Sequence, residues 1–168
     1  MLTTSQDEVD YGRGYADLRI VFGSPSAHGA ESDYLLGERL YPVATPGIAA
    51  GIATPQDLLR HRLIEVSTHR AGWAYVFEAL GILPAGARHA FADSTVMAMA
   101  MAAEGVGVAL ARAPASDKAM AEAGLVPCLP GVEVAGQGGY HLVYPDRGAL
   151  RPPARAFRSW LIELCRGL

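Results

Sequence analysis

The chain has 168 residues, of which 51% are hydrophobic and 18% are charged, and its formal net charge is −3 at pH 7. This composition excludes a mainly disordered chain, and the length suits one domain or two small lobes. Its 14 lysine and arginine residues are spread along the chain without a cluster, so we do not expect these residues to bind nucleic acid directly.

The cysteines and the N-terminus point to a reducing compartment. Cys128 and Cys165 are too few and too far apart for a disulfide scaffold or a zinc site, and are read as small buried hydrophobic residues. The first residues are polar and acidic rather than a signal peptide, and no apolar run reaches transmembrane length. We therefore expect a cytoplasmic protein without a membrane partner.

The first part of the chain predicts mainly extended structure. Ser5, followed three residues later by Glu8, forms a capping-box pattern that starts a short helix. Apolar and polar residues alternate over residues 17–22, which predicts a strand. Residues 24–33 are predicted as a polar loop. Residues 34–44 are predicted as one bent strand or two short ones that cross between lobes.

The middle of the chain predicts alternating helices and strands around one central helix. Two Thr-Pro pairs predict short helices, the second at residues 55–60. The central helix, residues 94–104, is rich in Ala and Met, with Asp93 or Ser94 as its N-cap and Gly105 after its end. Because it is apolar nearly all round, it must be covered on most sides. The other elements predicted here are a strand at 63–66, a helix at 72–80, and strands at 87–92 and 106–111.

The last part of the chain predicts two helices and two extended segments. The expected elements are a helix at 114–123, an edge strand at 125–129, a glycine-rich loop at 131–139, a strand at 140–144 and a helix at 152–165. The apolar stripe of the last helix is predicted to be Ala156, Phe157, Trp160, Leu161 and Leu164. The recurring order of strand and helix predicts an α/β fold with a parallel or mixed sheet covered by helices.

No motif for catalysis, cofactor binding or metal binding is recognisable. Ser24 stands in Gly-Ser-Pro-Ser, which lacks the glycine pattern of a nucleophile elbow. The Gly-x-Gly pairs at 12–14 and 105–107 lack the third glycine of a dinucleotide fingerprint. The five histidines are scattered without metal-ligand spacing. We expect no catalytic residue, no metal and no cofactor.

Polar residues do gather at the predicted strand-to-helix turns. If the strands are parallel, several of these turns meet at one sheet edge or across a cleft between lobes, where small carboxylates bind. A capped helix N-terminus adds free N–H groups and a partial positive charge. Each turn taken alone can equally be an ordinary helix cap. The positions concerned are Thr4, Ser5, Gln6, Phe22, Gly23, Ser24, Ser67, Thr68, Asp93, Ser94 and Thr95.

Several sequence motifs occur in a characteristic order. They are Ala-Asp-Leu-Arg-Ile-Val-Phe-Gly at 16–23, Leu-x-Glu-x-Leu-x-Pro-Val-Ala-x-Pro at 36–46, Thr-Pro-x-Asp-Leu-Leu-x-His-x-Leu-Ile at 54–64, Phe-x-Asp-Ser at 91–94, Ala-Ala-x-Gly-Val-Gly-Val-Ala-Leu-x-Arg at 102–112 and Tyr-x-Leu-Val-Tyr-Pro at 140–145. Over nearly the whole chain this order resembles the effector-binding domain of LysR-type transcriptional regulators, and most closely the subgroup that includes the glycine-cleavage activator.

The resemblance implies a type 2 periplasmic-binding-protein fold. This is an α/β fold of two subdomains with mixed sheets flanked by helices, joined by two crossing strands, with an effector in the cleft. We expect residues 1–44 to hold part of the first subdomain and a crossover strand, 45–111 the second subdomain, and 112–168 the return crossover and the closing helix. A complete regulator would also carry a winged helix-turn-helix, a linker helix and the first strand and helix of the first subdomain. The first subdomain is therefore expected to be incomplete and the chain N-terminally truncated.

The resemblance also implies a binding site and a function. Effector contacts are expected at Thr4, Ser5, Gln6, Phe22, Gly23, Ser24, Val66, Ser67, Thr68, Phe91, Asp93, Ser94 and Thr95. The expected function is a regulatory domain, not an enzyme, that senses a small polar or anionic metabolite. The resemblance further implies a homo-oligomer, a dimer or a tetramer when full-length, that contacts DNA only through the winged helix-turn-helix. The alternative is a free-standing solute-binding protein of the same fold, which the lack of an export signal disfavours.

Overall fold

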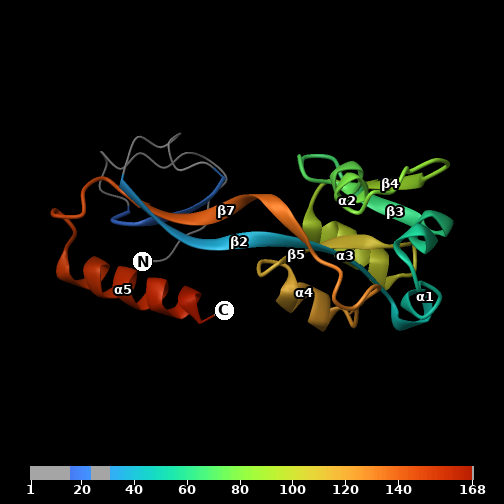
Figure 1. Cartoon of the computed structure of the whole chain (residues 1–168). Helices are drawn as coiled ribbons and strands as arrows, with labels where there is room; N and C mark the ends of the chain where they lie inside the picture. Colours follow the sequence, from blue (N-terminus) through green and yellow to red (C-terminus); the bar gives the residue numbers. More distant parts are fainter. Residues whose placement is uncertain (1–15, 24–30, 168) are drawn as a thin grey trace. The chain divides into compact units, whose positions relative to one another are not determined.

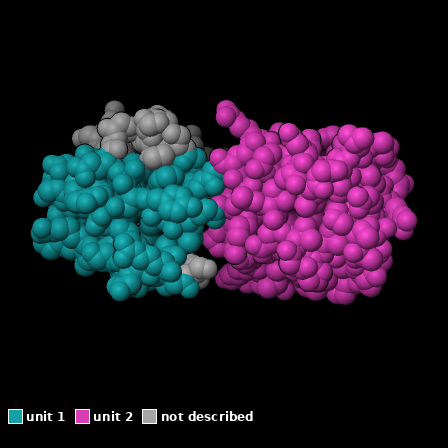
Figure 2. Space-filling view, in the orientation of Figure 1, with its two compact units in different colours: residues 1–37, 138–168 teal, residues 38–137 magenta. Residues whose placement is uncertain are grey.

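The computed structural model describes residues 16–23 and 31–167, which form two compact units. Unit 1 comprises Met1–Gly37 and Gly138–Leu168, and unit 2 comprises Glu38–Gln137 (Figure 2). The chain therefore passes between the units twice, after Gly37 and after Gln137. The sequence-based boundaries at residues 44 and 111 stay a prediction.

Two long strands contribute residues to both units. They are β2 (Glu31–Ala44) and β7 (Val134–Tyr144), which Figure 1 shows as the two longest ribbons of the sheet. The strand order is β1 (Arg19–Phe22), β7, β2, β5 (Ala109–Ala113), and β6 (Val126–Pro127) also pairs with β2. The chain is thus one continuous strand over 31–44, which includes residues 31–33 that were expected to be a loop.

The described part of unit 1 consists of strands and one long helix. β1 (Arg19–Phe22) pairs antiparallel with β7, with Ile20 opposite Leu142, and α5 (Pro152–Arg166) starts with proline at its first turn. Its buried residues include Leu35, Leu142, Tyr144, Leu150 and Ala154. The proline start of α5 and the strand at residues 19–22 confirm the sequence-based expectations for these segments.

The buried face of α5 differs from the predicted stripe. Phe157, Trp160 and Leu164 are 39%, 56% and 47% exposed, so this part of the stripe does not face the core of unit 1. Of the predicted stripe, Leu161 packs against this core, together with Ala154, Ile162 and Cys165. The rest of the stripe prediction was wrong, because helix periodicity identifies an apolar side without showing which side meets the sheet. Arg158 also lies toward the buried side, where it pairs with Asp33.

Unit 2 contains the remaining elements. Its strands are the inner part of β2, β3 (Arg62–Val66), β4 (Arg88–Ala92), β5 (Ala109–Ala113), β6 (Val126–Pro127) and the start of β7. Its helices are α1 (Pro46–Ala49), the 3-10 helix η3 (Pro55–Arg60), α2 (Trp73–Ala79), α3 (Thr95–Ala103) and α4 (Asp117–Glu122). β3 and β4 are parallel, whereas β2 pairs antiparallel with β5 and β6, so both types of pairing occur.

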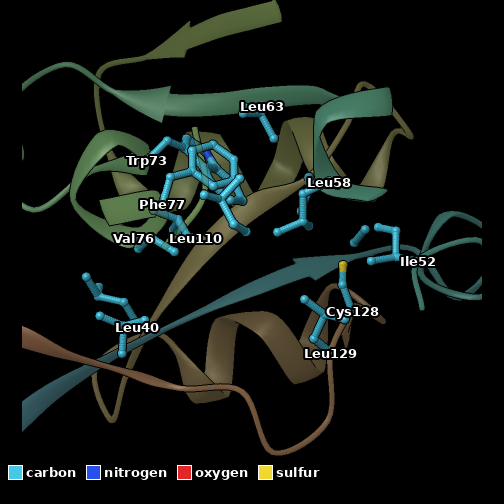
Figure 3. Close-up of a cluster of buried hydrophobic side chains, with 14 of the residues drawn as sticks. Leu40, Ile52, Leu58, Leu63, Trp73, Val76, Phe77, Leu110, Cys128 and Leu129 are labelled. Atoms are coloured by element: carbon cyan, nitrogen blue, oxygen red, sulfur yellow. The ribbon is translucent and has the colours of Figure 1, made fainter. Parts of the chain in front are cut away.

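The core of unit 2 is centred on Trp73 and Phe77, whose rings lie 5.5 Å apart (Figure 3). Both residues are buried, and the Trp73 indole N–H donates to the backbone oxygen of Ile64 at 2.9 Å. This bond satisfies the polar edge of a large buried ring and ties α2 to β3. The core is closed by Leu40, Leu58, Leu63, Val108, Leu110, Cys128 and Leu129.

The central helix α3 confirms its predicted caps, but the prediction that it is covered on most sides was wrong, because Val96 and Met97 on its outer side are 72% and 49% exposed. Ser94 is the N-cap, and its Oγ accepts from the Met97 N–H at 3.3 Å. Gly105 has a φ of +74°, the left-handed conformation that ends helices and that suits glycine. Small residues, Ala98 and Ala102, lie on its buried side together with Met99. Because the two alanine side chains are short, α3 packs closely over the β3, β4 and β5 strands.

Three segments differ from the sequence-based expectations. Residues 134–139 are part of β7, not a loop, because their glycines lie where neighbouring strands leave no room for a side chain. A Cβ at Gly138 would lie 2.7 Å from the Phe22 ring, and one at Gly139 would lie 2.9 Å from the backbone oxygen of Leu36. The helix expected at 114–123 covers only Asp117–Glu122, and the strand expected at 106–111 is Ala109–Ala113. The short helix expected after Ser5 lies outside the described residues.

Candidate functional site

The carboxyl ends of β3 and β4 lie side by side in unit 2. The two strands are parallel, and Val66 at the end of one is the register partner of Ala92 at the end of the other. The Ser67 N–H and Ser67 Oγ both donate to the Ala92 backbone oxygen, at 3.1 and 3.3 Å. The turn that begins at Ser67 therefore adjoins the turn at Asp93, as expected if polar turns follow parallel strands.

The second of these turns leads into α3. The Ser94 hydroxyl donates to the Asp93 carboxylate at 3.0 Å, while the same oxygen caps the helix. Thr95 is the first helical residue, and the first N–H groups of any helix have no acceptor within the helix. Asp93 and Ser94 are exposed, so solvent or a ligand can reach this end. The helix end offers hydrogen-bond donors and a partial positive charge next to one carboxylate.

The loop between β3 and α2, residues 67–72, is held from several sides. The His69 N–H donates to the Val66 backbone oxygen at 3.1 Å. The Glu65 carboxylate accepts the Trp73 N–H at 3.1 Å. It also lies so close to Gly72 that a Cβ there would be 2.2 Å from a carboxylate oxygen. Ser67 and Thr68 remain exposed on this anchored loop.

This loop is contacted by a buried ion pair, which the sequence analysis did not identify. An Arg112 guanidinium nitrogen lies 2.8 Å from a Glu38 carboxylate oxygen, and these side chains are only 11% and 5% exposed. The second terminal nitrogen of Arg112 donates to the backbone oxygen of Ala71 in the loop. The sequence signal that could have identified one partner is Arg112, the single charged residue of the otherwise apolar strand β5, whereas Glu38 lies among other charged residues of β2.

His69 lies in the field of this ion pair. Burial lowers the pKa of His69, the Arg112 guanidinium lowers it further, and the Glu38 carboxylate acts in the opposite direction. The Nδ1 atom of His69 is buried and has no hydrogen-bond partner within the protein. His69, which lies within the loop 67–72, is thus favoured in its neutral form.

The other predicted contacts lie in unit 1, outside the described residues, or elsewhere in unit 2. Phe22 and Gly23 belong to unit 1, where the Phe22 ring meets Tyr140 edge-on at 5.1 Å and the Gly23 N–H donates to the Gly139 backbone oxygen at 2.9 Å. Thr4, Ser5, Gln6 and Ser24 lie outside the described residues.

Within unit 2, two predicted contacts present little polar side-chain surface at the turns. Val66 is 8% exposed and contributes its side chain to the core beneath α3, whereas the Phe91 side chain is 68% exposed on β4 and stacks on His89. The geometry therefore brings together Ser67, Thr68, Asp93, Ser94 and Thr95. Their assignment as effector contacts stays a prediction.

Within 16–23 and 31–167, no group of three or more histidine, cysteine, aspartate or glutamate side chains could hold a metal ion. Over the same ranges, none of the helices combines the length and the apolar character that crossing a membrane requires.

Comparison with known proteins gives one consistent result. Residues 2–166 match the sequence profile of the family described as LysR substrate binding domain. The HTH-type transcriptional activator AmpR of Enterobacter cloacae is 32% identical over 165 residues, which cover 96% of this chain and 55% of that protein. The HTH-type transcriptional regulator PerR of Escherichia coli is 28% identical over 163 residues, with 96% and 55% covered. The chain thus spans about half the length of these curated relatives.

Solved structures agree with the sequence comparison. The effector domain of the transcriptional regulator AmpR of Pseudomonas aeruginosa superposes with a TM-score of 0.79 at 30% identity, covering 99% of this chain and 80% of that chain. The AmpR effector binding domain from Citrobacter freundii gives a TM-score of 0.75 at 24% identity, with 96% and 80% covered. These similarities confirm the predicted fold class, an α/β fold of the type 2 periplasmic-binding-protein kind.

Proposed function

The chain belongs to the LysR substrate-binding domain family, and we propose that it is the effector-binding domain of a LysR-type transcriptional regulator. Its relatives are named as transcriptional activators and regulators, so its role is regulatory rather than enzymatic. DNA contact is assigned to the part of such a regulator that this chain does not match. A ligand that binds two conformations with different affinity shifts the balance between them, which is how a signal would reach that part.

The observation that carries the binding role is the meeting of two polar turns at the ends of parallel strands. Ser67 and the capped end of α3 lie together there, held by hydrogen bonds to Ala92 and within the helix cap. Free helix N–H groups and exposed hydroxyls suit a small polar or anionic metabolite. The effector set proposed for the whole chain adds Phe22, Gly23 and the contacts outside the described residues.

We assign the chain to the subgroup that includes the glycine-cleavage activator, on the motif order alone. We also propose a cytoplasmic homo-oligomer, because LysR-type regulators act on DNA and the sequence carries their motifs throughout. A free-standing solute-binding protein is the second candidate, and it would bind a ligand without any effect on DNA binding.

A thermal-unfolding screen tests the binding role. The chain is melted with amino acids and with small aliphatic and aromatic carboxylates, and a compound at about 100 times its Kd should add roughly 2.7 kcal/mol to the unfolding free energy. Ser94→Leu should abolish the shift without unfolding the chain. Thr54→Leu is the matched control, because Thr54 is also a hydroxyl N-cap residue, its hydroxyl donates to the Asp57 carboxylate at 2.8 Å at the start of η3, and its loss should leave the shift intact.

Two results would contradict the proposal. Retention of ligand affinity in Ser94→Leu would refute the site assignment. In a full-length protein, a ligand that binds this domain but never changes DNA affinity would favour the solute-binding alternative over a regulator.

A further inference from the structure

The buried ion pair of unit 2 connects three elements that are distant in sequence. Glu38 lies on β2 and Arg112 on β5, where Leu40 is the register partner of Arg112. The guanidinium reaches the Glu38 carboxylate at 2.8 Å and also the Ala71 backbone oxygen in the loop 67–72. Arginine can serve both acceptors at once because its donors are arranged in a rigid planar fork. The Arg112 backbone N–H is occupied as well, by Ser116 Oγ at 2.6 Å.

The same pair borders the two places at which the chain passes between the units. Glu38 is the first residue of unit 2 after the first passage. Gly136, two residues before the second passage, lies directly on it, since a Cβ at Gly136 would be 2.4 Å from a Glu38 carboxylate oxygen. Next to Gly136, the Ala135 backbone oxygen accepts the Tyr75 hydroxyl from α2 at 2.8 Å. The first passage segment, residues 38–40, therefore contains Glu38, and the second, residues 134–137, packs against it. The partner of Glu38, Arg112, holds the loop 67–72.

The loop 67–72, which Arg112 contacts through the Ala71 oxygen, carries Ser67 and Thr68. Its first half is anchored by the Ser67 bonds to the Ala92 oxygen and by the His69 N–H on the Val66 oxygen, and its end by the Trp73 N–H on the Glu65 carboxylate. The Ala71 oxygen is held by Arg112. Any displacement of Ala71 must therefore break or redirect a hydrogen bond of a buried charged group, which is costly in a low-dielectric interior.

We propose that Arg112 and Glu38 are positioning residues that couple the loop 67–72 to the two segments at which the chain passes between its units. The inference rests on the proposed function for its purpose: an effector that orders the loop would change the bonding at both passage segments. The coupling itself needs no effector, because the contacts that produce it are present in the free chain.

Hydrogen exchange of the free chain, followed by mass spectrometry, tests the coupling. Arg112→Met and Glu38→Gln should each raise the exchange rate of peptides that span residues 66–73 by at least about tenfold, without changing peptides from α5. Glu38→Gln is the decisive variant, because the hydrogen bond to the Ala71 oxygen comes from Arg112, and Glu38 holds that guanidinium. Arg39→Met is the matched control, since the neighbouring Arg39–Glu133 pair is exposed and spans 3.6 Å. It should leave loop exchange unchanged.

A second variant keeps the test valid if Arg112→Met fails to fold. Replacement of both partners in Glu38→Met/Arg112→Met removes the buried charges together, which proteins often tolerate. Its loop should also exchange faster than in the wild type. Wild-type loop protection in folded Glu38→Gln, or in the folded double variant, would overturn the proposal.

The titration of His69 provides a readout that a general loss of stability would not produce. The carboxylate raises and the guanidinium lowers the pKa of His69, so Glu38→Gln should lower the NMR-measured pKa and Arg112→Met should raise it. Equal His69 titration in all variants would contradict the coupling. Neither measurement uses an effector, so a negative result leaves the proposed function standing, and the ligand screen tests that function separately.

Discussion

Removal of the Arg158 guanidinium should destabilise unit 1. Arg158 on α5 donates two hydrogen bonds of 2.6 Å to the Asp33 carboxylate on β2, in the fork arrangement that makes such pairs strong. Asp33 also accepts the hydroxyl of the buried Tyr144 at 2.6 Å, and the guanidinium lies 5.6 Å from the centre of the Tyr144 ring. This network explains why a charged residue occupies the buried side of α5.

The size of the effect follows from what remains after the change. Breaking a fully buried pair costs about 3–5 kcal/mol. In Arg158→Met, however, the carboxylate keeps the Tyr144 hydroxyl and an Arg147 nitrogen at 3.3 Å, and the Asp33 side chain is 16% exposed. Solvent and these two donors reduce the penalty, so we expect a loss of about 2–3 kcal/mol.

Urea unfolding followed by far-ultraviolet circular dichroism measures this loss. Arg155→Met is the matched control, because Arg155 is exposed on the same helix, and it should change the unfolding free energy by no more than about 0.5 kcal/mol. If Arg158→Met unfolds within about 0.5 kcal/mol of the wild type, the network does not hold α5 in place.

The pH dependence of the same network has a defined sign. Burial raises the pKa of Asp33, but the hydrogen bonds from Arg158 and Tyr144 outweigh burial and leave the pKa below its ordinary value. A folded-state pKa that is lowered contributes stability above the unfolded value, about 3.9, and that stability is lost as the pH falls through the folded value. Unfolding free energies measured from pH 5 to pH 2 should therefore fall less steeply in Arg158→Met than in the wild type. Parallel curves would show that Asp33 is not linked to folding through this pair.

Two further changes test packing and burial in the rest of the chain. Gly107→Ala would place a Cβ 2.0 Å from the Arg62 backbone oxygen, so we expect a loss of about 1–3 kcal/mol in urea unfolding. Gly47→Ala, which has open space around the new Cβ, should be neutral or stabilising, and equal effects of the two would contradict this account. Burial raises the pKa of the Cys128 thiol to about 12, so in the folded chain at pH 8 Cys128 should react with Ellman's reagent far more slowly than the half-buried Cys165. Equal rates for the two thiols would show that Cys128 is accessible.

Local chemistry explains which elements the sequence predicted well. Proline at the first helical turn placed η3 at residues 55–60 and the start of α5 at residue 152, as observed. The serine cap and the left-handed glycine bounded α3 in the same way. Each of these signals acts within a few residues of its own position, so it can be read without knowing what lies across the fold.

Features that depend on distant partners were read less well. The glycines of β7 suggested a loop because their reason for being glycine is the Glu38, Phe22 and Tyr34 side chains packed over them from other strands. The buried side of α5 was likewise set by a carboxylate 125 residues away in the chain. Periodicity and composition contain no information about such partners.

The candidate site shows the same division. The sequence alone showed that polar residues follow the strands that end at Val66 and Ala92, that Ser94 or Asp93 caps the helix after the second strand, and which family the motif order resembles. Only the tertiary structure decided that these strands are parallel neighbours in register, which brings Ser67 beside the start of α3. It alone also joined Glu38 to Arg112 across 74 residues, because burial of one charge requires an opposite charge that the fold must supply.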